Sequence, residues 1–244
     1  MYALQALSGK PINEIRHIMS KCGGDAVPDI QPAKYAKSLK LPGGPLLQCH
    51  REYLMRRGLD PDMLVRNYGI LGTGPFDTFE GIGYGYRIII PIYDLSGRLV
   101  SFQGRDITGA PGVERYKVCP VNKALMHYKD IVYGGNLATG RRVVVVEGVV
   151  DAWKLGPGAV ATFGTGCKKA QIMCLARWPE VVFFFDPEPA AQEKARMYAE
   201  ELAMCGVRTE VACEDFGVGP DGKKRDVGDL APHEILRIRE ELRI

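Results

Sequence analysis

The chain has 244 residues, of which 46% are hydrophobic and 25% charged, and its formal net charge is +3. This length and composition allow one large or two small globular domains, and so mild a positive charge does not by itself indicate nucleic-acid binding. No apolar run reaches the roughly 18 residues of a membrane-spanning helix, and the N-terminus lacks the pattern of a signal peptide. We therefore expect neither a transmembrane helix nor a signal peptide in this sequence.

Seven cysteines are scattered along the chain without any C-x-x-C pair. This usage is typical of reduced thiols, so we expect a cytoplasmic protein. Cys49 and His50 are adjacent, but a zinc site needs paired ligands at regular spacing. We therefore expect no zinc in this chain.

The first half of the chain predicts helices followed by antiparallel strands. Residues 1–45 predict short helices joined by loops, one of them in SGKPINEIRHIM. The stretches CHREYLMRRGL and DPDMLVRNYG predict two helices that end at Gly58 and Gly69. RIIIPIY and RLVSFQG predict two antiparallel strands joined by the turn DLSG. Arginine and lysine residues are frequent in and after these strands.

From about residue 140 the pattern alternates between strand and helix. The stretches RRVVVVEG, GAVATFG, EVVFFFD and VRTEVACE predict strands, each followed by helical sequence. Such alternation predicts a parallel sheet covered by helices on both sides. We therefore predict an N-terminal helical segment at 1–45, a basic subdomain at 46–139, an α/β domain at 140–236 and the end of a C-terminal helix at 237–244.

Acidic residues follow three of the predicted parallel strands. Glu147 ends the first strand, Asp186 and Glu188 follow the third, and Asp226 and Asp229 follow the fourth. Functional groups collect at the carboxyl ends of parallel strands, so we expect these carboxylates to meet at one edge. Carboxylates gathered there repel one another unless cations such as Mg²⁺ join them. Two such ions, about 4 Å apart, catalyse phosphoryl or nucleotidyl transfer.

A carboxylate after a buried strand is also a common helix cap or turn former. One such residue favours that simpler interpretation, whereas three groups at three strand ends favour a site. Asp151, four residues after Glu147, either orients the glutamate or caps the following helix, and both possibilities stay open. The glycine-rich stretches GTGCKK and GIGYGYR fit neither a P-loop nor a dinucleotide-binding fingerprint.

Several motifs in the same order resemble a known family. EGVVD, FFFDPEPAA and KRDVGD resemble the three acidic motifs of the TOPRIM domain, with Glu188 in place of the usual aspartate of the second motif. Upstream, YLMRRGL, IIIPIYDLSGRLVSFQGRD and RYK resemble the basic half of bacterial and phage primases. The resemblance spans about residues 48–230.

This resemblance implies a TOPRIM parallel sheet flanked by helices, preceded by a smaller basic α+β subdomain with antiparallel strands. It implies a DNA primase catalytic core that makes short RNA primers on single-stranded DNA from ribonucleoside triphosphates, with Mg²⁺ or Mn²⁺. Glu147, Asp186 and Glu188 would then be catalytic, and the metal ligands would be drawn from Glu147, Asp186, Glu188, Asp226 and Asp229.

The same resemblance assigns the basic residues and the partners. Arg57, Arg105 and Arg115 fall on basic positions that would bind template or triphosphate, and Lys117 is an alternative to Arg115. It also implies a replicative helicase and a zinc-binding domain on other chains, and a bacterial or phage-infected cytoplasm. Two alternatives stay open: a metal-dependent TOPRIM nuclease, and a non-catalytic replisome subunit that binds single-stranded DNA.

Overall fold

The fold is taken from a computed structural model of the chain, which describes residues 39–219, 222 and 224–244. The chain divides into two compact units, Met1–Lys34 and Tyr35–Ile244, and every described residue belongs to the second. Most of the helical segment predicted at 1–45 therefore lies outside the described residues. No described helix is long and apolar enough to cross a membrane.

The second unit begins with two helices, α3 (Gln48–Arg56) and α4 (Pro61–Tyr68). Both are followed by a glycine at positive φ, 64° at Gly58 and 65° at Gly69, a backbone conformation that glycine adopts without strain. Asp60 caps α4 by accepting hydrogen bonds from two backbone N–H groups of its first turn. The two predicted helices and their ends are confirmed.

An antiparallel sheet follows in the order β1-β4-β5-β6. Its long central pair is β4 (Arg87–Tyr93) with β5 (Leu99–Asp106), joined by the predicted turn. The edge strands are β1 (Leu71–Gly72) and β6 (Tyr116–Val118), and a separate small hairpin is formed by β2 (Thr78–Phe79) and β3 (Ile82–Gly83). Two 3-10 turns, η1 (Tyr128–Asp130) and η2 (Gly135–Leu137), lead out of this half.

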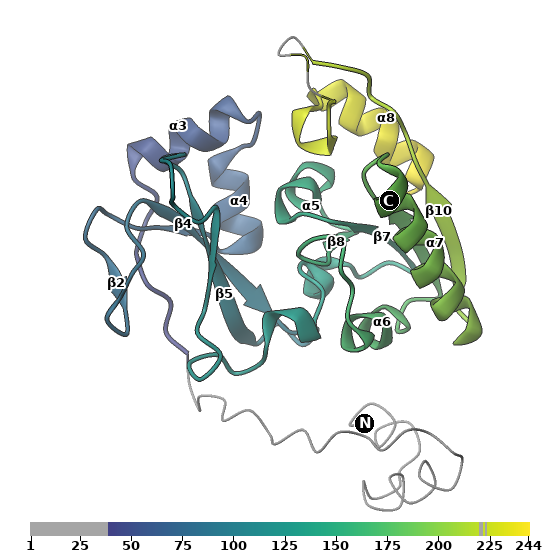
Figure 1. The fold of residues 1–244 in the computed structure, drawn as a ribbon, viewed down its shortest axis with the longest axis horizontal. Coiled ribbons are helices and arrows are strands. Elements are labelled where there is room, and N and C mark those ends of the chain that lie inside the picture. The colour runs from purple at the N-terminus through teal and green to yellow at the C-terminus, as the bar shows by residue number, and fades with distance from the viewer. Residues whose placement is uncertain (1–38, 220–221, 223) are drawn as a thin grey trace, which may run out of the picture. The chain divides into compact units, whose positions relative to one another are not determined.

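The second sheet has four parallel strands in the order β10-β9-β7-β8 (Figure 1). They are β7 (Arg142–Val146), β8 (Ala159–Ala161), β9 (Glu180–Phe184) and β10 (Arg208–Ala212). The intervening and following helices are α5 (Val149–Leu155), α6 (Lys169–Leu175), α7 (Pro189–Met204), the turn η3 (Val227–Asp229) and α8 (Pro232–Leu242).

Successive side chains of β7 point to opposite faces of the sheet and join different cores. Val144 and Val146 belong to a cluster that includes residues of α5 and α8. Val143 and Val145 belong to a second cluster with residues of α6 and α7. The strand is therefore buried on both faces, which confirms the predicted α/β fold and explains the run of four valines.

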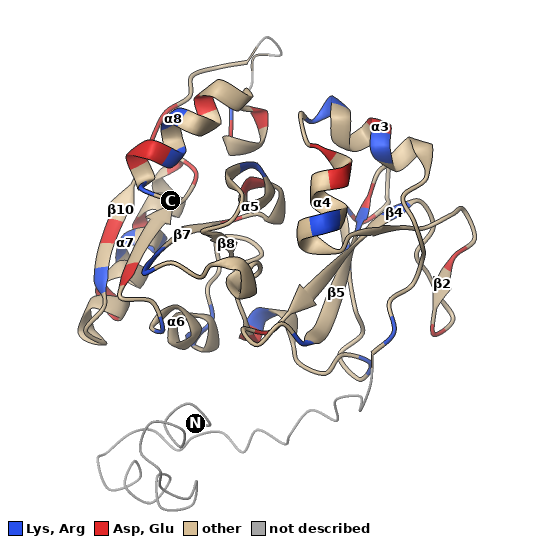
Figure 2. Ribbon diagram, turned by 180° about the vertical axis from the view of Figure 1, so that it is seen from behind, with Lys and Arg blue, Asp and Glu red and all other residues tan. Residues whose placement is uncertain are grey.

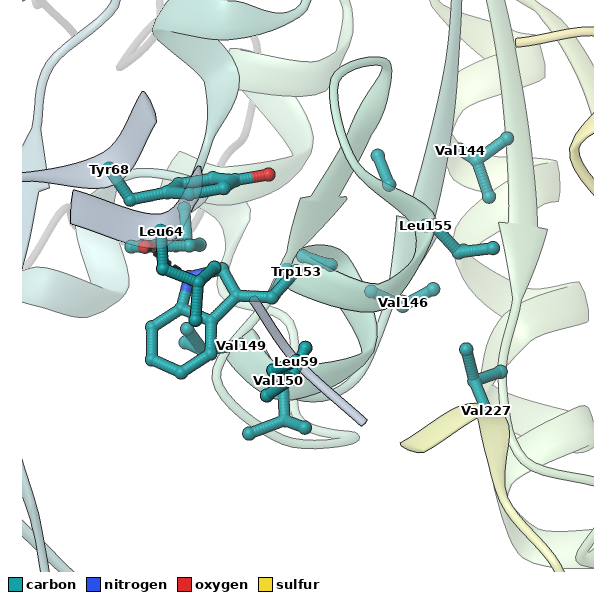
Figure 3. Packing of buried hydrophobic residues seen from close by; sticks show 14 of the residues in the cluster. Leu59, Leu64, Tyr68, Val144, Val146, Val149, Val150, Trp153, Leu155 and Val227 are labelled. Atoms are coloured by element: carbon teal, nitrogen blue, oxygen red, sulfur yellow. Dashed lines mark hydrogen bonds between the residues drawn. The ribbon is translucent and has the colours of Figure 1, made fainter. Parts of the chain in front are cut away.

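The first of these cores also contains residues of the antiparallel half. Trp153 of α5 is buried, lies among Leu64, Tyr68 and Val149, and donates a hydrogen bond from Nε1 to the Tyr133 hydroxyl at 2.8 Å (Figure 3). Tyr68 stacks on Tyr133 with ring centroids 5.8 Å apart. The two halves thus share one continuous core, and the predicted boundary between residues 139 and 140 stays a prediction.

Candidate active site

The carboxyl ends of β7 and β9 bring the first two acidic motifs together. Glu147 follows the last buried valine of β7 and is half-buried, and its Oε1 accepts a hydrogen bond from the Asp186 backbone N–H at 3.3 Å. The intervening Gly148 leaves room for Asp151, because a Cβ at Gly148 would come within 2.6 Å of Asp151 Oδ2. Neighbouring strands therefore place Glu147 beside Asp186, as the sequence motifs require.

Asp226 is the N-cap of the short turn η3, and Asp229 is the last residue of that turn. The Asp226 backbone N–H donates to Asp229 Oδ2 at 3.2 Å, so Asp229 caps this turn. Buried Val227 anchors the turn in the shared core. Glu188 is exposed and immediately precedes α7, in the position of its N-cap. Glu188 and Asp226 lie near enough to affect the pKa of Asp186, whereas Asp229 is placed here only by its cap of η3.

Burial and mutual repulsion raise the pKa values of three of these carboxyl groups. Burial, then the negative charge of Asp186, raise the pKa of Glu147 to about 7, although Lys194 opposes this. Burial, then Asp226 and Glu188, raise the pKa of Asp186 to about 6. Within the described residues, no lysine or arginine forms a salt bridge with Glu147 or Asp186. Neither of these two carboxyl groups is therefore paired directly with a cation within the described residues.

Asp151 performs one of the two roles that its spacing left open, that of the helix cap. Its Oδ2 accepts the Gly148 backbone N–H at 3.1 Å, which caps α5. Burial, then Asp226 and Asp186, raise the pKa of Asp151 to about 7, so its carboxyl group also lies within the acidic cluster. The set of metal ligands predicted from the sequence omitted it. The sequence feature that could have included Asp151 is its position four residues after Glu147, one helical turn away.

The donor set of this edge suits a hard divalent cation, because it consists of carboxylate oxygens that repel one another. Across the described residues, no three histidine, cysteine, aspartate or glutamate side chains are gathered closely enough to hold a metal ion by themselves. Magnesium is commonly held by one or two carboxylates, completed by water and substrate phosphates. The residues therefore fit an ion that is bound together with a phosphate, and they do not form a closed cage.

These pKa values predict how stability changes with pH in the absence of divalent ions. Glu147, Asp151 and Asp186 bind protons more readily in the folded than in the unfolded protein. Their contribution to stability is therefore fully present below about pH 4 and is lost as the pH rises through 6 to 7. Melting temperatures measured in EDTA between pH 5 and 8 should fall as the pH rises, and Mg²⁺ should flatten the profile.

The variant Asp151→Asn isolates this effect, because its amide oxygen can still accept the Gly148 N–H. It should show a weaker decline between pH 5 and 8 than the wild type. Buried His50, whose pKa is lowered by burial, acts in the opposite direction in both proteins and cancels in the comparison. Equal declines in the two proteins would contradict the assignment of Asp151 to the cluster.

A basic pocket of about 480 Å³ lies in the antiparallel half and is lined by three of the arginines singled out from the sequence, Arg57, Arg105 and Arg115. Arg105 is only 3% exposed. Its Nε donates to the Tyr53 hydroxyl at 2.6 Å, its Nη1 donates to the Tyr116 hydroxyl, and its guanidinium lies over both rings. Arg105 is therefore held rigidly at the wall, whereas Arg115 is exposed at the rim.

Lys117 lies elsewhere. Arg105 is the cross-strand neighbour of Tyr116, so the adjacent Lys117 points to the opposite face of the sheet. There its Nζ donates to the Gly83 carbonyl at 3.0 Å and lies over the Tyr84 ring. The structure thus brings Arg57, Arg105 and Arg115 together and separates Lys117 from them. The tyrosines and Arg56, which also lines the pocket, were not singled out from the sequence.

Arg57 connects the basic pocket with the acidic edge. It directly follows α3, and its Nη2 would lie 3.4 Å from a Cβ at Gly228, between Asp226 and Asp229 in the chain. Its Nε is buried and has no hydrogen-bond partner in the part of the chain that the structure describes. Figure 2 shows basic segments on α3, and both an acidic and a basic segment on α5. An arginine pocket beside a carboxylate edge defines a site that can hold phosphate groups next to divalent ions.

Comparison with known proteins agrees with this class of site. No protein-family model matches the sequence. The chain is 32% identical over 207 residues to the DNA primase of Synechococcus elongatus, covering 78% of this chain and 28% of that protein. It is 29% identical over 165 residues to the DNA primase of Helicobacter pylori strain J99, covering 62% of this chain and 29% of that protein. The chain thus spans less than a third of the length of these relatives.

Solved structures give the same result for the fold. A DnaG primase catalytic domain bound to single-stranded DNA matches with a TM-score of 0.65 at 22% identity, covering 86% of this chain and 74% of that one. The zinc-binding and RNA polymerase domains of Aquifex aeolicus primase match with a TM-score of 0.66 at 18% identity, covering 81% and 56%.

The fold is therefore that of a primase-type catalytic core, a basic antiparallel half followed by a TOPRIM sheet. More specifically, the chain is related in sequence to bacterial DNA primases, and its described part has the fold of their catalytic core. The predicted resemblance to a bacterial or phage primase core is confirmed.

Proposed function

We propose that this chain is the catalytic core of a DNA primase, which joins ribonucleotides into short RNA primers on single-stranded DNA in the cytoplasm of a bacterium or a phage-infected cell. The observation that carries the proposal is the contact of Arg57 with the turn that bears Asp226 and Asp229. It joins an arginine pocket for phosphates to a carboxylate edge for divalent ions, as template-directed nucleotidyl transfer requires.

Glu147 is the proposed general base or metal-adjacent acid, since a pKa of about 7 suits proton transfer near neutral pH. Asp186, Glu188 and Asp226 are proposed to hold Mg²⁺ or Mn²⁺, with Asp229 and Asp151 supporting them. When bound, such ions polarise the reacting phosphate and neutralise developing charge on the leaving pyrophosphate. Glutamate at Glu188 is longer by one methylene than the aspartate usual in this motif, so its carboxylate reaches the site from farther away.

Arg57, Arg105 and Arg115 are proposed to bind the phosphates of the template strand or the incoming ribonucleoside triphosphate. Guanidinium groups bind phosphate oxygens in pairs, and a rigidly held one loses little entropy on binding. The DnaG catalytic domain with the same fold is described as bound to single-stranded DNA, which supports a nucleic-acid ligand here. A replicative helicase and a separate zinc-binding domain are proposed as partners.

Synthesis of labelled RNA on a single-stranded template tests the proposal. The full chain, a helicase and a zinc-binding domain from a primase are incubated with ribonucleoside triphosphates and Mg²⁺ or Mn²⁺. We expect short labelled products that require the metal and the template. Cleavage of the template without synthesis would favour the alternative of a TOPRIM nuclease, and neither reaction would favour a non-catalytic DNA-binding subunit.

Arg115→Gln should weaken binding of single-stranded DNA more than Lys117→Gln does. Arg115 is exposed at the rim of the basic pocket, whereas Lys117 points to the other face of the sheet. Loss of one phosphate contact should reduce the slope of log affinity against log salt concentration by about 0.7.

Fluorescence anisotropy of a labelled oligonucleotide at several salt concentrations measures both quantities. Lys117→Gln removes the same charge from a neighbouring position of the chain, so it serves as the matched control. If the two variants lose the same affinity and the same slope, the basic pocket is not the strand-binding surface.

A further inference from the structure

Lys154 is a cation that no acidic or basic motif of the sequence included. It lies in the last turn of α5, the helix that begins beside Glu147 and includes Asp151. Its Nζ donates a hydrogen bond to the Leu230 backbone carbonyl at 3.0 Å. Leu230 ends η3, the turn that includes Asp229. This hydrogen bond of Lys154 therefore connects α5, which bears Asp151, with η3, which bears Asp229.

The same ammonium group also packs against the segment that follows α3. A Cβ at Gly58 would lie only 2.9 Å from Lys154 Nζ, so any side chain there would displace the ammonium group. Gly58 is the residue after Arg57, whose guanidinium in turn lies against Gly228 of η3. Three chain segments therefore meet at Lys154: the C-terminal part of α5, the turn η3 and the end of α3.

Within the described part of the chain, Lys154 is bound by a backbone carbonyl and not by a carboxylate, although two aspartates are near it. Burial, then the positive charge of Arg57, lower the pKa of Lys154, while Asp229 and Asp226 oppose this change. Its hydrogen bond goes to a backbone carbonyl, and among the described residues Lys154 forms no salt bridge with either aspartate. The carboxylate oxygens of η3 are therefore not occupied by this lysine.

The turn η3 packs closely against Arg57 and Asp151, since a Cβ at its Gly228 would lie 3.4 Å from Arg57 Nη2 and 3.6 Å from Asp151 Oδ1. We propose that Lys154 is a positioning residue, which holds η3 and Arg57 at a fixed distance from the carboxylates beside α5. This inference rests on the proposed function, because it assigns a supporting residue to the same metal and phosphate site. Residues that orient metal ligands typically change metal affinity about 10- to 100-fold when they are replaced.

Binding of Mn²⁺ to the full chain tests the proposal, with free Mn²⁺ measured by electron paramagnetic resonance. Lys154→Met keeps much of the apolar stem but removes the hydrogen bond and the charge, so we expect about tenfold weaker Mn²⁺ binding. Lys154→Arg retains a cationic donor and should restore most of the affinity. In primer synthesis, the Mn²⁺ concentration for half-maximal rate should rise by the same factor, with the rate recovering at saturating Mn²⁺.

Lys123→Met is the matched control, because Lys123 pairs with Glu80 of the hairpin turn at 2.6 Å, outside the acidic edge and the basic pocket. It should bind Mn²⁺ as the wild type does. If Lys154→Met also binds Mn²⁺ like the wild type, Lys154 only packs and the inference is wrong, while the proposed function stands. If the wild type lowers free Mn²⁺ neither alone nor beyond the effect of an added ribonucleoside triphosphate, both the metal site of the proposed function and this inference are wrong.

Gly58→Ala provides a second test if Lys154→Met does not fold. The added Cβ must displace Lys154 Nζ without removing any charge, so Mn²⁺ affinity should again fall several-fold. Gly97→Ala is its control, because Gly97 also has positive φ, 82°, but a Cβ there meets nothing within 4 Å. Equal Mn²⁺ affinity in the two glycine variants would overturn the inference.

Discussion

We expect Asp186→Asn to lower the rate of primer synthesis by about 10²- to 10³-fold while leaving the protein folded, as the loss of one preorganised electrostatic group does in other active sites. Asp186 follows β9 and lies beside Glu147, and burial, then the negative charge of Asp226, raise its pKa to about 6. An amide of the same shape keeps the packing but is a poor ligand for a hard cation. Primer synthesis at saturating nucleotide and Mg²⁺ measures the loss.

The same variant should be more stable than the wild type when divalent ions are removed. Asparagine relieves the repulsion among the carboxylates, so the melting temperature in EDTA near pH 8 should rise. Mg²⁺ should raise the melting temperature of the wild type more than that of Asp186→Asn, because the ion stabilises only a state that binds it. Opposite changes in activity and metal-free stability distinguish a metal ligand from a merely structural residue.

Glu193→Gln is the control for both measurements. Glu193 lies on α7, the helix that Glu188 precedes, and its exposed carboxylate makes no hydrogen bond within the described residues. Neither activity nor melting temperature should change. If Asp186→Asn makes primers at the wild-type rate, the acidic edge is not the catalytic site, whatever its likeness to primases.

Local patterns in the sequence predicted the long strands β4 and β5, the four strands of the parallel sheet and the approach of Glu147 to Asp186, but not the short strands β1, β2, β3 and β6. The valine run of β7 has no polar alternation because both of its faces are buried, and this is visible in the sequence itself. Gly58 and Gly69 mark helix ends because the backbone there has positive φ. Glu147 and Asp186 meet because parallel strands end at the same edge of their sheet, a general property of the fold.

The basic pocket was predictable only in part, because it depends on strand register. An uncertainty of a residue or two in aligning RYK leaves both Arg115 and Lys117 as candidates. They lie two residues apart, a spacing that strand alternation alone does not separate, and Arg115 directly precedes β6 whereas Lys117 lies within it. Because Arg105 pairs with Tyr116, the side chain of Lys117 points to the opposite face of the sheet and away from the basic pocket. The contact of Arg105 with Tyr53, the approach of Arg57 to Gly228 and the bond from Lys154 to Leu230 join residues distant in sequence. No short motif encodes such contacts.

The largest loss of stability should follow from Trp153→Ala, at about 3–5 kcal/mol in the free energy of unfolding. Trp153 is 1% exposed, packs against Tyr68 and donates to the Tyr133 hydroxyl. It belongs to the core that the antiparallel half and the TOPRIM half have in common. Removal of the indole leaves a cavity that neither half can fill without displacing the other. Urea denaturation followed by circular dichroism measures the loss.

Two further variants separate the parts of this effect. Tyr133→Phe removes only the hydrogen-bond acceptor, so the buried indole N–H loses its partner at a cost of about 1–3 kcal/mol. Phe76→Ala is the surface control and should change stability by less than about 0.5 kcal/mol, because Phe76 is 92% exposed. A continuous core also requires that both halves unfold in one transition. Two separate transitions, of which Trp153→Ala shifts only the later one, would contradict this expectation. The two halves would then fold independently, and this core would not fix the distance between Arg57 and the acidic edge.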